Sequence, residues 1–177
     1  MREPLGIYLH IPFCRSKCDY CDFYSLAGQE DRMDAYQQAL LAQIAESAPL
    51  AAKKYAVDTI YIGGGTPSWY GAERVRELLS AVKKGYKIAR GAEITMEANP
   101  DSVDVDSLRM LRRAGVNRIS MGMQSACDNE LACIHRPHNF RQVKEAVAAA
   151  RKAKIKNLNL DLIYGLPGQR HIRIEID

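Results

Sequence analysis

The chain has 177 residues, of which 47% are hydrophobic and 26% are charged. This composition is typical of one ordinary globular domain, and it excludes disordered and fibrous proteins. The net charge of +4 comes without a basic stripe interleaved with aromatic residues, so no binding to nucleic acid is expected.

Five apolar runs, partly β-branched, alternate with stretches that carry apolar residues at helical spacing. The runs at 5–11, 57–62, 92–97, 116–123 and 157–164 predict buried parallel strands. The stretches at 33–44, 75–82, 105–111 and 140–147 predict crossover helices. Ser102 and Asn139 are expected to cap the third and fourth helices at their N-termini, and Gly115 to end the third.

Repeated strand-helix units predict an α/β fold with about five parallel strands and helices on the outside, either open or rolled toward a barrel. Polar or glycine residues follow each strand, and carboxyl ends of parallel strands meet at one rim where ligands bind. The segments expected there are Tyr8 with His10, 63–66, 97–100, Gln124 with Ser125, and Asp161 with 165–168.

Three of the five cysteines, Cys14, Cys18 and Cys21, lie within eight residues after the first strand. In a reducing compartment this spacing favours a metal or cluster site over disulfides. Soft thiolates select iron-sulfur clusters or zinc, and three of them would hold a 4Fe-4S cluster with one iron open to an exchangeable ligand. A zinc site with His10 as fourth ligand is an alternative, although no second pair of ligands at zinc spacing follows.

The other two cysteines, Cys127 and Cys133, occupy a helical segment and are expected to be small buried hydrophobic residues. His135 and His138 are expected at the surface or in packing, with heme contact as the second interpretation. Arg136 between them could pair with Glu130 instead of serving a site.

A series of motifs follows the chain in order: 8–14 (YLHIPFC), the cysteine spacing, 63–67 (GGGTP), 97–100 (EANP), 122–125 (GMQS), 136–138 (RPH) and 161–168 (DLIYGLPG). Through these motifs the chain resembles the radical S-adenosylmethionine superfamily, in the branch of coproporphyrinogen oxidases and heme chaperones. The resemblance implies a partial (βα) barrel over residues 1–169.

The resemblance also implies ligands. A 4Fe-4S cluster on Cys14, Cys18 and Cys21 would chelate S-adenosylmethionine and cleave it with one electron, so an electron donor is an expected partner. Tyr8 and Tyr20 would flank the cofactor, and Gly64, Gly65 and Thr66 would pass its methionine moiety. Its polar groups would contact Glu97, Gln124, Arg136 and Asp161. No catalytic residue is assigned.

Two differences from the decarboxylating oxidases of this branch favour a heme chaperone, which would bind heme and transfer it to an acceptor protein. The decarboxylating oxidases carry a further cysteine two residues after the third, where this chain has Phe23, and they begin with an N-terminal extension. The alternative function is oxygen-independent oxidation of coproporphyrinogen III to protoporphyrinogen IX in porphyrin biosynthesis.

The last eight residues, 170–177, place isoleucine at every second position, which predicts a strand where the family has a helix. A truncated chain that lacks the family's C-terminal domain is therefore expected, and a non-catalytic remnant is the third functional alternative. The chain carries no apolar run of roughly 18 residues and no signal peptide, so a cytoplasmic protein without a membrane span is expected.

Overall fold

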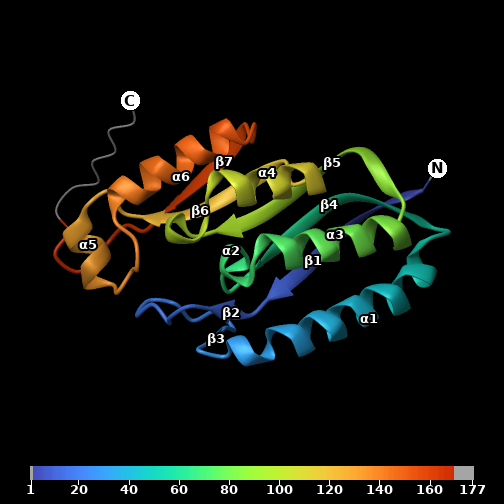
Figure 1. Cartoon of the computed structure of the whole chain (residues 1–177), viewed down its shortest axis with the longest axis horizontal. Helices are drawn as coiled ribbons and strands as arrows, with labels where there is room; N and C mark the ends of the chain where they lie inside the picture. The colour runs from blue at the N-terminus through green and yellow to red at the C-terminus, as the bar shows by residue number, and fades with distance from the viewer. Residues whose placement is uncertain (1, 170–177) are drawn as a thin grey trace.

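The computed structural model describes residues 2–169, which build a parallel sheet of five strands (Figure 1). The strands lie side by side in chain order: β1 (Glu3–Ile11), β4 (Tyr55–Gly64), β5 (Ile88–Ala98), β6 (Arg118–Gln124) and β7 (Asn157–Leu162). Every neighbouring pair is parallel. The five predicted strands are confirmed, although β1, β4 and β5 begin earlier than their apolar runs, β6 begins later, and β7 ends sooner.

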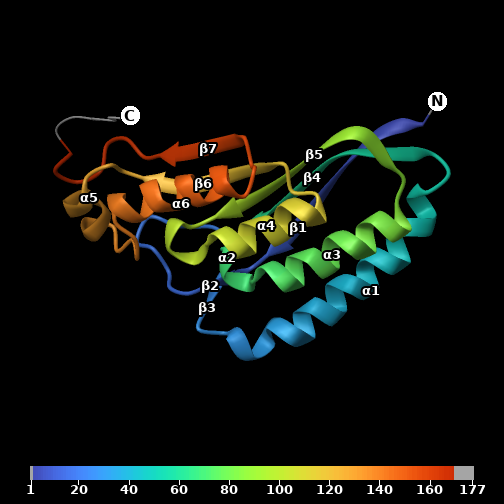
Figure 2. The same cartoon turned by 45° about the horizontal axis from the view of Figure 1, so that its top comes forward.

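Four long helices connect these strands and lie together along one face of the sheet (Figure 2). They are α1 (Met33–Ala51), α3 (Ala72–Gly85), α4 (Val105–Ala114) and α6 (Phe140–Lys152). Helix α1 packs against α3, α3 against α4, and α4 against α6. Strands in chain order with helices on one face are typical of a (βα) barrel and not of a doubly wound sheet, which confirms the predicted fold class.

The hydrophobic core fills the layer between the sheet and these helices. Its fully buried members include Ile62, Met96 and Met121 from the strands and Leu79 and Leu108 from the helices. Within residues 2–169, no helix is long and apolar enough to cross a membrane. The predicted strand at 170–177 lies outside the described residues.

Short elements that the periodicity did not predict gather near the carboxyl ends of the strands. They are β2 (Phe13–Cys14), β3 (Leu26–Ala27), η1 (Glu30–Arg32), α2 (Pro67–Tyr70), η2 (Pro100–Ser102) and α5 (Asp128–Cys133). Strands β2 and β3 pair in parallel, and the Leu26 N–H donates to the Pro12 carbonyl at 2.6 Å. This pairing closes the two ends of the cysteine-bearing loop onto each other.

The helix caps follow the prediction at two of three positions. Asn139 caps α6 by accepting the Gln142 N–H, and Gly115 ends α4 in the left-handed region with φ 110°. The predicted cap Ser102 is wrong, because its hydroxyl donates to the Asn99 carbonyl at 3.0 Å within η2. Asp104 caps α4 instead, accepting the Ser107 N–H at 2.7 Å in a reciprocal capping box.

Replacing Asp104 by alanine is expected to lower the free energy of unfolding by about 1 kcal/mol near neutral pH, whereas asparagine retains most of the cap. Hydrogen bonds from Ser107 lower the pKa of Asp104 below its ordinary value of 3.8. The charge-dependent part of this stability is therefore present above that value and is lost as the pH falls through the lower folded-state pKa. Urea unfolding of both variants near neutral pH and at about pH 3 measures it; an Asp104→Ala cost that persists fully in acid would contradict this account.

Candidate functional site

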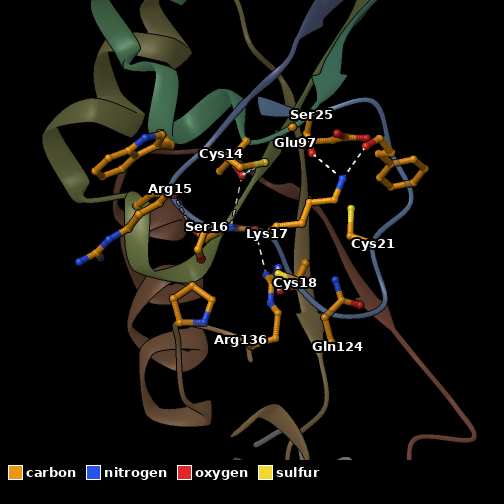
Figure 3. Close-up of a pocket in the computed structure, with 18 of the residues that line it drawn as sticks. Cys14, Arg15, Ser16, Lys17, Cys18, Cys21, Ser25, Glu97, Gln124 and Arg136 are labelled. Carbon is orange, nitrogen blue, oxygen red and sulfur yellow. Dashed lines mark hydrogen bonds between the residues drawn. The ribbon is translucent and has the colours of Figure 1, made fainter. Parts of the chain in front are cut away.

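The cysteine loop runs from the end of β2 to β3 and holds all three predicted ligands half-buried. The Cys21 N–H donates to the Cys18 carbonyl at 3.1 Å, which makes a turn that brings these two residues together. Lys17 spans the loop by donating from Nζ to the Phe23 carbonyl at 2.8 Å and to Ser25 Oγ at 3.1 Å (Figure 3). The loop is therefore braced from within.

A cavity of about 820 Å³ opens between this loop and the carboxyl ends of β4, β5, β6 and β7. That volume lies within the range of cofactor sites. It brings together all the predicted ligands except Tyr8, and Figure 3 shows several of them from the loop and the strand ends around one space. The predicted residues that line it are Cys14, Cys18, Tyr20, Cys21, Gly64, Gly65, Thr66, Glu97, Gln124, Arg136 and Asp161.

Tyr8 does not line the cavity and lies beside the rings of His10 and Tyr61. Its hydroxyl is 3.0 Å from His10 Nδ1, and its ring centroid lies 6.1 Å from that of Tyr61. His10 Nε2 is 3.1 Å from the Tyr24 carbonyl, so both ring nitrogens have partners within the protein. Contact of Tyr8 with a cofactor stays a prediction.

Glycine is required where the chain passes the first cysteine. A side chain at Gly65 would place its Cβ 2.7 Å from the Phe13 carbonyl oxygen and 3.0 Å from Cys14 Sγ. The Gly65 N–H donates to the Ile11 carbonyl at 2.7 Å, which holds the two segments together. Because no larger residue fits, the backbone after β4 forms a cradle directly against the thiol.

Glu97 holds Gly64, the residue before Gly65 in the glycine segment. Its Oε2 accepts the Gly64 N–H at 2.9 Å, and its Oε1 accepts the Tyr61 hydroxyl at 2.7 Å. Burial, followed by this carboxylate, raises the pKa of Tyr61 well above its ordinary value of 10.0. Glu97 thus presents a negative charge to the cavity while holding the backbone beside the cysteine loop.

Arg136 joins the far side of the cavity to the loop. Its Nη2 donates to the Gly122 carbonyl at 2.8 Å, and its Nη1 lies within hydrogen-bond distance of Cys18 Sγ at 3.5 Å and of the Tyr20 hydroxyl at 3.4 Å. Burial raises the pKa of Tyr20 to about 12, against the opposing effect of the guanidinium. The predicted alternative partner Glu130 is instead bonded by Ser125 and Gln169.

The remaining predicted polar groups come from the last two strands. Gln124 ends β6 with φ 65°, an unusual backbone for a non-glycine residue, and its carbonyl accepts the Ile163 N–H at 3.0 Å. Asp161 on β7 accepts from Ser120 Oγ at 3.2 Å and is exposed to the cavity. Both side chains are therefore placed at the rim where the sequence predicts them.

The donor set fits a cluster better than a single ion. Among residues 2–169, no group of three or more His, Cys, Asp or Glu side chains converges closely enough to hold one metal ion. A zinc ion needs four ligands around one centre. His10, the fourth ligand of the zinc alternative, does not line the cavity, and both its ring nitrogens lie against Tyr8 and the Tyr24 carbonyl, so the structure does not support that alternative. A 4Fe-4S cluster binds each thiolate on a separate iron, and Cys14, Cys18 and Cys21 all line the same cavity.

Two other predictions have different outcomes. Cys127 and Cys133 are exposed, so the expectation that they are buried is wrong: α5 turns only Leu131 fully into the core. His138 is buried with Nε2 3.1 Å from the Met123 carbonyl, as a packing histidine, and burial lowers its pKa. His135 is exposed, and its Nδ1 lies 2.7 Å from Asp19 Oδ2 on the cysteine loop.

The sequence assigned no role to Asn99, which lines the cavity and bonds two of the predicted residues. Its only signal was its position in the EANP segment at the end of β5. Ser120 and Gly122 line the same cavity and were likewise not singled out as ligands.

Comparison with known proteins agrees with this architecture. The family model described as the radical SAM superfamily matches residues 8–175. The chain belongs to the radical SAM superfamily. Membership of this superfamily implies a 4Fe-4S cluster and S-adenosylmethionine as ligands. Membership accounts for three thiols, a glycine cradle and acidic strand ends in one cavity.

Individual relatives of this radical SAM chain fall into both predicted groups. It is 42% identical over 168 residues to the heme chaperone HemW of Escherichia coli, and 37% identical over 165 residues to the oxygen-independent coproporphyrinogen III oxidase of Bradyrhizobium diazoefficiens. The alignments cover 94% and 93% of this chain but only 44% and 37% of those proteins. The chain thus spans less than half the length of these curated relatives.

Among solved structures, the radical SAM enzyme coproporphyrinogen III oxidase (HemN) from Escherichia coli superimposes with a TM-score of 0.88 at 32% sequence identity. The match covers 95% of this chain and 39% of that one. The similarity extends over nearly the whole sheet and its helices.

Proposed function

We propose that this chain is the cluster- and S-adenosylmethionine-binding part of a heme-handling protein of the heme chaperone type. The observation that carries the proposal is the single cavity lined by the three cysteines, the glycine segment and the polar strand ends. Its similarity to the heme chaperone HemW adds support. Residues 1–169 would constitute the radical SAM core.

In this proposal Cys14, Cys18 and Cys21 hold the cluster, and Glu97 and Asp161 accept hydrogen bonds from polar groups of S-adenosylmethionine. When bound, the cluster and S-adenosylmethionine would supply the one-electron chemistry. Lys17 braces the cysteine loop, and Gly65 lets the backbone after β4 lie directly against Cys14. The cysteine loop forms one side of the cavity.

Heme binding is supported by exposed aromatic side chains beside the cavity. Phe23 lines the cavity and is 71% exposed, and Tyr24 beside it is 77% exposed with its ring 6.1 Å from that of His10. Exposed aromatic groups of this kind suit a flat apolar ligand with polar edges. The proposal includes an electron donor, a heme-acceptor protein and a cytoplasmic setting, where thiols stay reduced.

The second candidate is oxidative decarboxylation of coproporphyrinogen III, favoured by the relatives that carry that name. Phe23, in place of a further cysteine, argues for the chaperone. The two candidates differ in what they do to a porphyrin: a chaperone binds heme unchanged, whereas the oxidase removes carboxyl groups from propionates.

A heme titration of the anaerobically reconstituted chain tests the proposal. We expect a saturable Soret band with about one heme per chain and no release of carbon dioxide from coproporphyrinogen III with S-adenosylmethionine and reductant. No Soret band would contradict heme handling. Release of carbon dioxide with 5'-deoxyadenosine would favour the oxidase, and the absence of both signals would contradict both candidate functions.

A further inference from the structure

Asn99 bridges two side chains that each reach a different cysteine. Its Oδ1 accepts from Arg136 Nη2 at 2.9 Å, and its Nδ2 donates to Thr66 Oγ1 at 3.5 Å. The Arg136 guanidinium reaches Cys18 Sγ at 3.5 Å, and the Thr66 hydroxyl reaches Cys14 Sγ at the same distance. A continuous hydrogen-bonded path therefore links two of the three predicted cluster ligands.

The chemistry of arginine fixes the direction of this path. A guanidinium can only donate, so the Asn99 atom facing Arg136 must be the carbonyl oxygen. The amide NH₂ then faces Thr66 and occupies a lone pair of its hydroxyl oxygen. The Thr66 proton is left free to point at Cys14 Sγ, so the amide of Asn99 orients both sulfur donors at once.

The position of Asn99 is itself held. Its backbone N–H donates to Ser68 Oγ at 3.0 Å, its carbonyl accepts from Ser102 Oγ at 3.0 Å, and the two hydroxyls lie 2.6 Å apart. Gly122 leaves room for the Arg136 contact, since a Cβ there would lie 3.2 Å from Nη2. These constraints mark a built arrangement at the carboxyl end of β5.

We propose that Asn99 is a positioning residue for the cluster thiolates of Cys14 and Cys18, a role that rests on the proposed cluster function. Hydrogen bonds to cluster sulfurs, and a positive charge near them, stabilise the reduced and more negative state and so make the cluster easier to reduce. Among the described residues, no side-chain donor reaches Cys21 Sγ, so the donors act on two of the three thiolates.

The test compares Asn99→Leu, which is close in size and cannot hydrogen-bond, with Asn129→Leu, an exposed asparagine on α5 outside the cavity. Each reconstituted chain is titrated with dithionite and redox mediators in the absence of S-adenosylmethionine, and the reduced cluster is counted by electron paramagnetic resonance. At a fixed solution potential, Asn99→Leu is expected to lower the ratio of reduced to oxidised cluster about tenfold, and the control to leave it unchanged.

A second pair of variants keeps the test independent of how well Asn99→Leu assembles. Thr66→Val removes the hydroxyl that reaches Cys14 and should lower the ratio of reduced to oxidised cluster. Thr66→Ser retains the hydroxyl and should keep this ratio at the wild-type value. In the double variant with Asn99→Leu, the Thr66→Val effect should shrink, because Asn99 acts partly through that hydroxyl.

An unchanged ratio in Asn99→Leu at full iron content would overturn the positioning role, as would equal ratios in the Thr66→Val and Thr66→Ser chains. A wild-type chain that takes up no cluster would be a different result, because it contradicts the proposed function on which this inference depends.

Discussion

Cys18→Ala is expected to reduce the iron bound after anaerobic reconstitution from about four atoms per chain to less than about one. Two thiolates are too few to hold the cluster, and Cys18 is also the ligand that receives the Arg136 guanidinium. The measurement is iron and sulfide analysis together with the charge-transfer absorbance of the cluster.

The matched control for this experiment is Cys133→Ala. Cys133 is exposed on α5 and does not line the cavity, so its loss removes a thiol without removing a ligand. We expect the control to bind iron as the wild-type chain does. If Cys18→Ala retained full absorbance, or if Cys133→Ala lost it, the assignment of ligands would be wrong.

Glu97→Gln is expected to weaken binding of S-adenosylmethionine at least about tenfold while sparing the cluster. The change removes a negative charge from the cavity, and it also places an amide NH₂ against the Tyr61 hydroxyl or the Gly64 N–H, both of which now donate to the carboxylate. Equilibrium dialysis against the reconstituted chain measures the affinity, and iron analysis measures the cluster.

Glu93→Gln is the control on the same strand and the same face of β5. Glu93 pairs with Arg118 at 3.8 Å and lies outside the cavity lining, so its change alters charge without altering the site. Equal affinity in the two glutamine variants would show that Glu97 has no specific part in cofactor binding.

Local patterns in the sequence were sufficient to predict the strands, the crossover helices and the cysteine loop. Buried parallel strands appear as continuous apolar runs, and three thiols within eight residues indicate a metal or cluster site without knowledge of the fold. The rim position of Glu97, Gln124 and Asp161 follows from parallel topology alone.

Features that depend on tertiary contacts were missed or mistaken. The role of Asn99 depends on two partners 33 and 37 positions away, and no local pattern records them. Cys133 was predicted to be buried from its apolar neighbours, but α5 is a single short helix with one buried face. Ser102 does not cap α4, because its hydroxyl is hydrogen-bonded to the Asn99 carbonyl and to Ser68 Oγ.

The cysteine loop is joined to the segment before α6 by Arg136 at Cys18 and by His135 at Asp19, across 118 and 116 positions. The side of the pocket that Arg136 forms is therefore missing until three strand-helix units and β6 have assembled, and such distant pairings form late and slowly. Loading with iron should thus follow folding of the barrel segment and not nucleate it, in contrast to zinc fingers, where the metal drives folding. A nascent chain that has exposed only its first cysteines would have little means of retaining a cluster.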